Sequence, residues 1–125
     1  MKLEDIPKKE GIIKMDNIMY VIGSRSIARV ASALANDTRA RILSIIAREK
    51  IADLDRIADE IKQSKANISS QIRKLENVGI VSATYKPGER GIKKLIELKV
   101  DAIIFVMRKD NEQVGSPKVE ETTGS

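Results

Sequence analysis

The sequence predicts a mainly α-helical domain with a small β-hairpin, an α+β fold, and three observations support this. Apolar residues recur every three or four residues from about residue 26 to 78. After residue 79 the pattern changes to the alternation typical of strands. The chain has 125 residues, enough for one domain with a modest core. We expect a flexible arm over residues 1–15, one domain over residues 16–107 and a disordered tail over residues 108–125.

Two helices are predicted first, each from one apolar stripe. The first begins near Ser26, and its stripe consists of Ile27, Val30, Ala31 and Leu34. Asn36 and Asp37 end this helix and supply a cap for the second, which runs from Thr38 to about Glu49. The residues expected in the core of the second helix are Ile42, Leu43, Ile45 and Ile46.

Two further short helices are predicted with a tight connection between them. The third is capped by Asp53, and its apolar stripe consists of Leu54, Ile57, Ala58 and Ile61. Lys62-Gln63 leads into a fourth helix, which Ser64 caps and Gly79 stops. The apolar seam of this fourth helix consists of Ile68, Ile72, Leu75 and Val78. Short amphipathic helices joined in this way form a helix-turn-helix arrangement.

The alternating pattern that follows predicts a β-hairpin. Its strands are expected over residues 80–86 and 92–99, with Pro87-Gly88 at the centre of a type II turn. The cationic tip, KPGERGIKK, and the length of the hairpin indicate a projecting wing. The apolar run over residues 100–107 fits a buried strand or a helix, and its β-branched content favours a strand.

The positive charge of the chain is concentrated around the last predicted helix and the hairpin. Residues 62–94 contain eight cations and two anions, an excess of six, whereas the whole chain carries +5. Such a local excess is typical of polyanion binding, because neutralised phosphates release counterions. A solvated basic face is the alternative interpretation.

Several function classes are excluded or disfavoured by composition. Cysteine and histidine are absent, which excludes disulfides, thiol or imidazole catalysis and ordinary zinc sites. There is no Gly-rich phosphate loop, so neither an enzyme nor a cofactor is expected. The N-terminus lacks a continuous apolar stretch, so we expect a cytoplasmic protein without a membrane anchor. The richness in Ile, Lys and Glu resembles thermophile usage.

The fourth helix carries an unusual polar face opposite its apolar seam. At 100° per residue that face consists of Ala66, Asn67, Ser70, Arg73, Lys74 and Asn77, flanked by Ser69 and Gln71. Small polar side chains permit close approach to a surface, and Asn, Gln and Arg are well suited to base edges in a major groove. A helix exposed only to water more often carries Glu and Lys pairs. Contact with DNA is therefore favoured over an acid-poor solvent face.

Two segments resemble those of a known family. ALANDTRARILSII resembles the signature that opens the ArsR-type winged-helix regulators, and SKANISSQIRKLENVGIV is similar to their recognition helix. With the wing, the resemblance covers about residues 26–99. It implies a winged helix-turn-helix fold, a homodimer, and repression by binding a two-fold DNA operator. The DNA contacts expected from the resemblance and the charge pattern together are Ser64, Lys65, Asn67, Ser69, Ser70, Gln71, Arg73, Lys74, Lys86, Arg90 and Lys93.

Further cations are expected to attract phosphates without reading sequence. These are Arg39, Arg41, Lys62 and Lys94, in addition to Lys86 and Lys93. Arg90, at the wing tip, is expected in or beside the minor groove, where narrow A·T tracts attract guanidinium, or else simply solvated.

The sequence departs from the family in two places. Many members sense metals through Cys or His, which this chain lacks, so no metal is expected. The acids Asp53, Asp55, Asp59 and Glu60 lack ligand spacing, and capping and solvation explain them better. The run over 100–107 stands where the family usually has a C-terminal helix. We expect this run and the apolar residues of 16–34 to form the dimer interface. The alternative is that they complete the monomer core.

The expected function is therefore that of a non-metal-sensing, archaeal-like regulator that acts as a repressor, as the resemblance implies. Two other functions remain open. One is an architectural double-stranded DNA-binding protein with weak sequence preference, and the other is a winged-helix protein interaction module.

Overall fold

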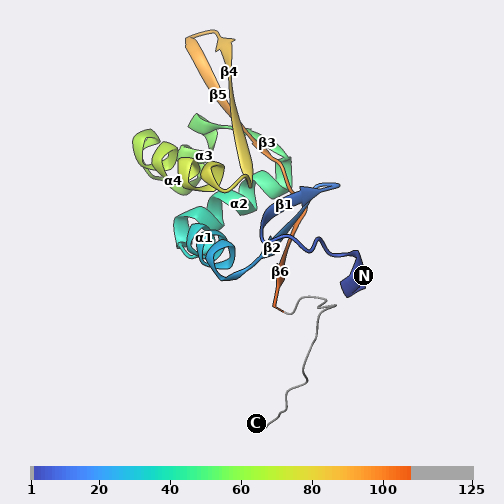
Figure 1. Cartoon of the computed structure of the whole chain (residues 1–125). Helices are drawn as coiled ribbons and strands as arrows, with labels where there is room; N and C mark the ends of the chain where they lie inside the picture. Colours follow the sequence, from blue (N-terminus) through green and yellow to red (C-terminus); the bar gives the residue numbers. More distant parts are fainter. Residues whose placement is uncertain (1, 108–125) are drawn as a thin grey trace, which may run out of the picture.

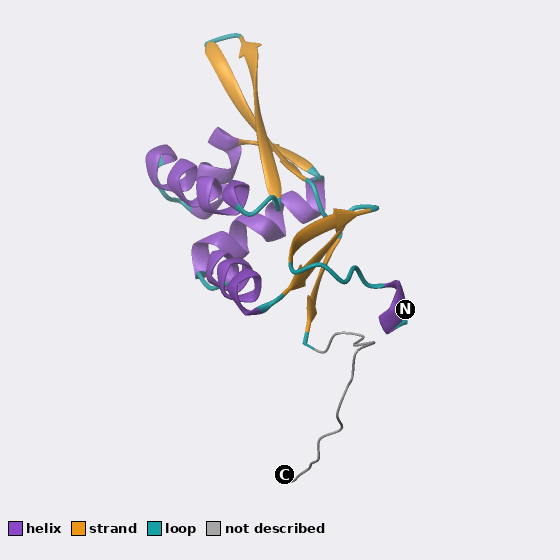
Figure 2. Ribbon diagram, in the orientation of Figure 1, coloured by secondary structure: helices purple, strands orange, loops and turns teal. Residues whose placement is uncertain are grey.

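The computed structural model describes residues 2–107, and its helices and strands have the α+β arrangement that the sequence predicts (Figures 1 and 2). In chain order the elements are η1 (Leu3–Asp5), β1 (Gly11–Met15), β2 (Ile18–Ile22), α1 (Ser24–Leu34), α2 (Asp37–Glu49), β3 (Ile51–Asp53), α3 (Leu54–Ile61), α4 (Lys65–Asn77), β4 (Val81–Gly88), β5 (Gly91–Leu98) and β6 (Ala102–Val106). The strands form two three-stranded sheets, in the orders β1-β2-β6 and β3-β5-β4. The expected disordered tail, residues 108–125, lies outside the described residues.

The predicted helices and their caps are confirmed. The side chains of Asn36, Asp53 and Ser64 each accept a hydrogen bond from a backbone N–H in the first turn of α2, α3 and α4. Helix α1 begins two residues earlier than expected, and Ala31 on its predicted stripe is exposed. Beyond the end of α4, Gly79 has a φ of 87°, which a residue with a Cβ rarely adopts.

One core joins the four helices to the base of the wing. Ile42, Ile57, Ile72 and Ile96, one from each of α2, α3, α4 and β5, are all 0% exposed. The residues of the predicted α4 seam, Ile68, Ile72, Leu75 and Val78, are buried with them. Because side chains from both the helices and the hairpin are locked into this cluster, α4 and the wing have a fixed relative orientation.

The strands of the wing extend closer to its tip than the sequence predicted, and the turn is a different one. Pro87 and Gly88 were expected at the turn, but they belong to β4, where they pair with Ile92 and Gly91. The turn is instead formed by Glu89 and Arg90, and the left-handed φ of 111° belongs to Gly91. The prediction failed because Pro is tolerated on an edge strand, and β4 is an edge strand of its sheet. In Figure 1 this hairpin projects well beyond the helices.

The second sheet was only partly foreseen. Part of the expected N-terminal arm, residues 11–15, forms β1, which pairs with β2 through a tight turn at Asp16 and Asn17, both with positive φ. The run over 100–107 contains the strand β6, as favoured from its composition, and β6 lies parallel to β2. Parallel pairing of residues 84 positions apart, as Ile18 with Ala102, leaves no local sequence signal.

This sheet already buries many of the apolar residues assigned to a dimer interface. Met19, Val21 and Val100 belong to the main core, and Tyr20, Ile22 and Val106 form a second small cluster. Completion of the monomer core, the alternative considered from sequence, therefore accounts for this part of the segments 16–34 and 100–107.

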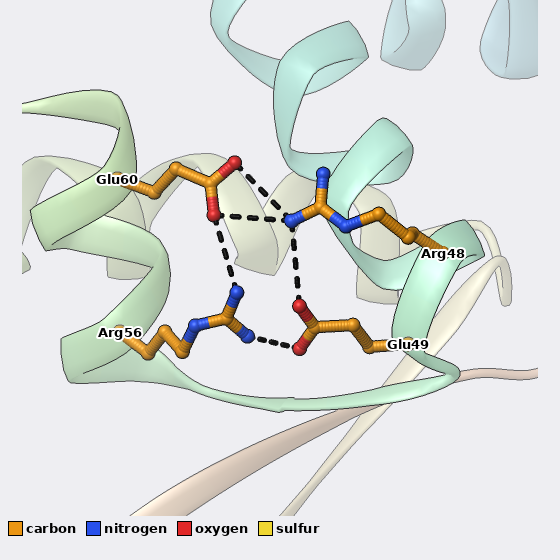
Figure 3. Close-up of polar contacts among 4 residues, drawn as sticks. All are labelled: Arg48, Glu49, Arg56 and Glu60. Carbon is orange, nitrogen blue, oxygen red and sulfur yellow. Dashed lines mark hydrogen bonds and ion pairs between the residues drawn. The ribbon is translucent and has the colours of Figure 1, made fainter.

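Four charged side chains connect the end of α2 to α3 (Figure 3). Arg48 lies 3.1 Å from Glu60 and 3.3 Å from Glu49, and Arg56 contacts both of the same carboxylates. The hydrogen bond from Arg56 holds the pKa of Glu49 below its ordinary value. Hydrogen bonds to Glu60 and Glu49 raise the pKa values of Arg48 and Arg56, respectively. The network thus holds the first helix of the helix-turn-helix against α2.

Among the helices of residues 2–107, none is long and apolar enough to cross a membrane.

Candidate nucleic-acid interface

Helix α4 leaves one side uncovered by the rest of the described chain. Its seam packs inward, whereas all six residues predicted on the opposite face are exposed: Ala66, Asn67, Ser70, Arg73, Lys74 and Asn77. Ser69 and Gln71 are half-buried at its margins. The only acid within α4 is Glu76, also half-buried. The structure therefore presents an acid-poor surface of small polar and cationic side chains.

The beginning of α4 is held in place by polar contacts. Ser64 Oγ accepts a hydrogen bond of 3.1 Å from the backbone N–H of Asn67. Lys65 Nζ lies 3.3 Å from a carboxylate oxygen of Asp55 on α3. Both side chains are exposed, so they lie at the surface where an anion approaching the helix N-terminus would meet them.

Behind this face, Arg39 has a different role from the phosphate contact that was predicted. It is only 7% exposed, and its guanidinium donates to the carbonyls of Ser32 and Ala33, at 3.3 and 2.6 Å, and to Gln71 Oε1. The prediction failed because charge alone does not distinguish an exposed arginine from one that satisfies carbonyls at a helix end. Arg41, the other cation predicted at the start of α2, is exposed.

Gln71 belongs to a series of hydrogen-bonded side chains that starts at Arg39. Gln71 Nε2 donates to Asn67 Oδ1 at 3.5 Å, the longest contact of the series. Asn67 Nδ2 donates to Gln63 Oε1, and Gln63 Nε2 donates to Thr38 Oγ1 at 3.1 Å. Both ends of the series are on α2, so it ties the middle of α4 to the rest of the domain. Sequence reasoning placed Asn67 and Gln71 at the interface but missed that they are linked.

The wing carries two lysines directly opposite each other. Lys86 on β4 pairs in register with Lys93 on β5, so both side chains lie on the same face of the hairpin. Like charges in this position destabilise a hairpin unless an anion neutralises them. Asp53 neutralises one of them, since Lys93 Nζ lies 3.3 Å from its carboxylate. Lys86 is exposed, as is Arg90 in the turn.

On its other face the wing contacts α4 through a residue pair. Lys94 Nζ donates to Ser69 Oγ at 3.2 Å and lies 5.7 Å from the centre of the Tyr85 ring. Tyr85 is 65% exposed, which makes it an aromatic side chain available at the junction of wing and helix. From sequence alone, Tyr85 is predicted only as a residue of a strand. The cross-strand register with Lys94 is the signal that would have identified it.

Three of the four acidic residues considered for a metal site have other partners. Asp53 caps α3 and pairs with Lys93, Asp55 pairs with Lys65, and Glu60 pairs with Arg48 and Arg56. Within residues 2–107, no group of three or more Asp or Glu side chains is arranged to hold a metal ion.

The arrangement of α3, α4 and the β4–β5 hairpin is a winged helix-turn-helix, and the comparisons with known proteins agree. The family model described as "Bacterial regulatory protein, arsR family" matches residues 36–83, from the cap of α2 into β4. These residues are therefore similar to an ArsR-family helix-turn-helix, and the match falls within the segment where the resemblance was noted. The matched family model and the similar winged-helix structure are those of DNA-binding transcriptional regulators.

Solved structures support the same fold. A possible transcriptional regulatory protein from Mycobacterium bovis is 26% identical, with a TM-score of 0.50 over 58% of this chain and 73% of that one. A solution structure of the same Mycobacterium bovis fragment, described as a homodimeric winged helix-turn-helix DNA-binding domain, is likewise 26% identical, with a TM-score of 0.50 over 58% of this chain and 63% of that one. A transcriptional regulator homologue from Pyrococcus horikoshii OT3 is 24% identical, with a TM-score of 0.50 over 54% of this chain and 67% of that one. No curated protein sequence matches the chain.

Proposed function

We propose that this protein is a sequence-specific DNA-binding regulator that acts as a homodimeric repressor on a palindromic operator. The observation that carries the proposal is the acid-poor exposed face of α4, held by the core beside a cationic wing. Its width and chemistry suit the major groove, which admits one α-helix. The ArsR-family match of residues 36–83 supports the same function.

The candidate residues divide into two roles by position. Asn67, Ser70, Gln71 and Arg73 lie at the middle of α4 and are proposed to contact base edges. Cations and hydroxyls around them are proposed to contact phosphates and fix the register: Ser64, Lys65, Ser69, Lys74, Lys86, Lys93 and Lys94. Ser69 fits this role through Lys94, which it already contacts. Arg90, in the wing turn, is proposed to approach the minor groove.

The homodimer is proposed to form through β6. Within residues 2–107, β6 pairs with β2 alone, so the backbone groups of its other edge are unpaired. Residues 102–107 carry no charge, and Met107 is 80% exposed, whereas the opposite edge strand β1 carries Lys14. Natural edge strands normally carry charges that prevent pairing, so an uncharged apolar edge favours a partner strand. A second copy fits because antiparallel pairing of identical strands is self-complementary.

Such a dimer is compatible with binding one DNA duplex. Two antiparallel β6 strands in one continuous sheet are related by a two-fold axis perpendicular to that sheet. Helix α1 packs on β1 and β2 and also contacts α4, so the helices of both copies would lie on the same side of the joined sheet. Both α4 helices would then be available to one duplex, where half-sites one helical turn apart are separated by about 34 Å. The similar domain from Mycobacterium bovis is homodimeric, which supports a dimer here. The proposed β6 interface rests on this chain alone.

Selection of bound fragments from genomic DNA by the purified protein tests the proposal. A palindromic consensus with half-sites about 10 base pairs apart is expected for a dimeric operator-binding protein. Enrichment without a consensus would favour an architectural protein, as would equal affinity for a promoter fragment and a random duplex at the same salt. Negligible affinity for DNA even at low salt would favour a protein interaction module. Repression in particular requires a promoter reporter whose output falls when the protein is present.

A further inference from the structure

The hydrogen bonds behind α4 have a fixed direction, which Arg39 sets. A guanidinium can only donate hydrogen bonds. Arg39 is held in one position because it is nearly buried and satisfies the carbonyls of Ser32 and Ala33 at the end of α1. Gln71 must therefore turn its oxygen, and not its nitrogen, toward Arg39.

The orientation of the first amide determines that of the others. With its oxygen at Arg39, Gln71 has its nitrogen toward Asn67, which has to accept with its own oxygen. Asn67 then donates to Gln63, and Gln63 donates to the hydroxyl of Thr38. A reversal of either interface amide would set two donors or two acceptors against each other, which costs about 1–3 kcal/mol for a group left unsatisfied.

This direction decides what the exposed face of α4 offers to DNA. The amide oxygens of Asn67 and Gln71 each accept one hydrogen bond and are thereby turned toward their donors within the series, whereas each amide nitrogen carries two hydrogens and uses one of them there. The remaining N–H groups are donors. Arg73 and Lys74 on the same face are also donors only. The middle of α4 therefore presents mainly donors.

We infer that Asn67 and Gln71 select bases that present an acceptor in the major groove, namely guanine or thymine, and that Arg39 is a positioning residue that imposes this choice. Guanine offers N7 and O6, and thymine offers O4. The bidentate recognition of adenine by an amide also needs the amide oxygen to point at the N6 amino group, whereas here the oxygens point at Arg39 and Gln71. The inference rests on the proposed function, because it specifies which bases the proposed interface reads.

In vitro selection from random duplexes with three variants tests the inference. Gln71→Met removes the polar group and so locates the base position that Gln71 contacts. At this position the full-length protein is expected to select guanine or thymine. Gln71→Glu keeps an acceptor for Arg39 but cannot donate, so its preference should change to cytosine or adenine, by about 5- to 100-fold for one base contact. Asn17→Asp, in the exposed turn between β1 and β2, adds the same negative charge far from α4 and should leave the motif unchanged.

The outcomes separate the inference from the proposed function. Adenine or cytosine at the located position in the unmodified protein would overturn the inference while leaving sequence-specific binding intact. The same holds for an unchanged preference in Gln71→Glu. If the unmodified protein enriches no motif at all, the proposed function fails, and the inference fails with it.

Arg39→Gln tests the positioning role. A glutamine can donate or accept, so Gln71 would no longer be held in one orientation. The preference should fall to about twofold or less at the base position of Gln71 and also at that of Asn67, whose orientation Gln71 sets, while the positions read by other residues are retained. A merely structural role of Arg39 would lower the affinity for every sequence by the same factor and leave the preference unchanged. Circular dichroism establishes that the variant is folded, and if it is not, the Gln71→Glu selection alone decides.

Discussion

The opposed lysines of the wing lead to a prediction in which DNA binding and stability change in opposite directions. Lys86 and Lys93 face each other across β4 and β5, and only Lys93 has an ion-pair partner in Asp53. The substitution Lys86→Thr removes the repulsion and introduces a residue that favours strands. Cross-strand pairs of this kind contribute about 0.2–1 kcal/mol, so the free energy of unfolding should rise by that amount at low salt and less at high salt.

The same substitution should weaken DNA binding. Each phosphate contact contributes about 0.9 to the slope of log K against log salt on duplex DNA, so the slope should become shallower by about 0.9. Fluorescence anisotropy over a salt series measures the slope, and thermal or urea unfolding measures stability. Because phosphate contacts carry little sequence information, specific and random duplexes should lose affinity alike.

Lys14→Thr is the matched control for this variant. Lys14 is an exposed lysine on the strand β1, opposite Met19 rather than another lysine. The substitution Lys14→Thr removes the same charge outside the wing, so we expect neither a rise in stability nor a shallower salt slope. The reasoning is refuted if Lys86→Thr lowers stability, or if its salt slope equals that of Lys14→Thr.

Three further predictions concern α4, the core and the ion-pair network. Arg73→Ala should weaken specific binding by about 1–3 kcal/mol and random-duplex binding much less, and equal losses on both DNAs would contradict its role in base contact. Ile72→Ala, at a side chain with 0% exposure, should lower the free energy of unfolding by about 2–5 kcal/mol in urea, and a loss well below this range would contradict the close packing of α4. Glu49→Gln should lower the melting temperature at neutral pH, because Arg56 lowers the pKa of Glu49 and this carboxylate stabilises the fold only while ionised. The stabilisation is lost as the pH falls below 4.5, the ordinary pKa of a glutamate, and then through the lowered pKa of Glu49. If the two proteins still differ in melting temperature in strong acid, the charge of Glu49 is not the cause of the difference.

The helical part of the fold is predictable from sequence because its signals are local. In a stripe such as Ile68, Ile72 and Leu75, each residue lies one helical turn from the next. A cap such as Ser64 acts on the three residues that follow it. The exposed face of α4 followed from the same periodicity. Each of these features depends on neighbours close in sequence.

The features that were missed depend on residues far apart. The β6 strand is identified by its apolar content, yet its parallel pairing with β2 has no local signature. Pro87-Gly88 has the composition of a turn, but the register of the whole hairpin places these residues in β4. The burial of Arg39 required the end of α1 and Gln71 of α4 to meet at one point.

The central claim, that the uncovered side of α4 meets DNA, is tested most directly by NMR titration of the isotopically labelled protein with a duplex at low salt. The account predicts that the largest amide shifts fall on Asn67, Ser70 and Arg73 and on the wing turn at Arg90. Shifts confined to the β1-β2-β6 sheet, or none at any DNA concentration, would contradict it.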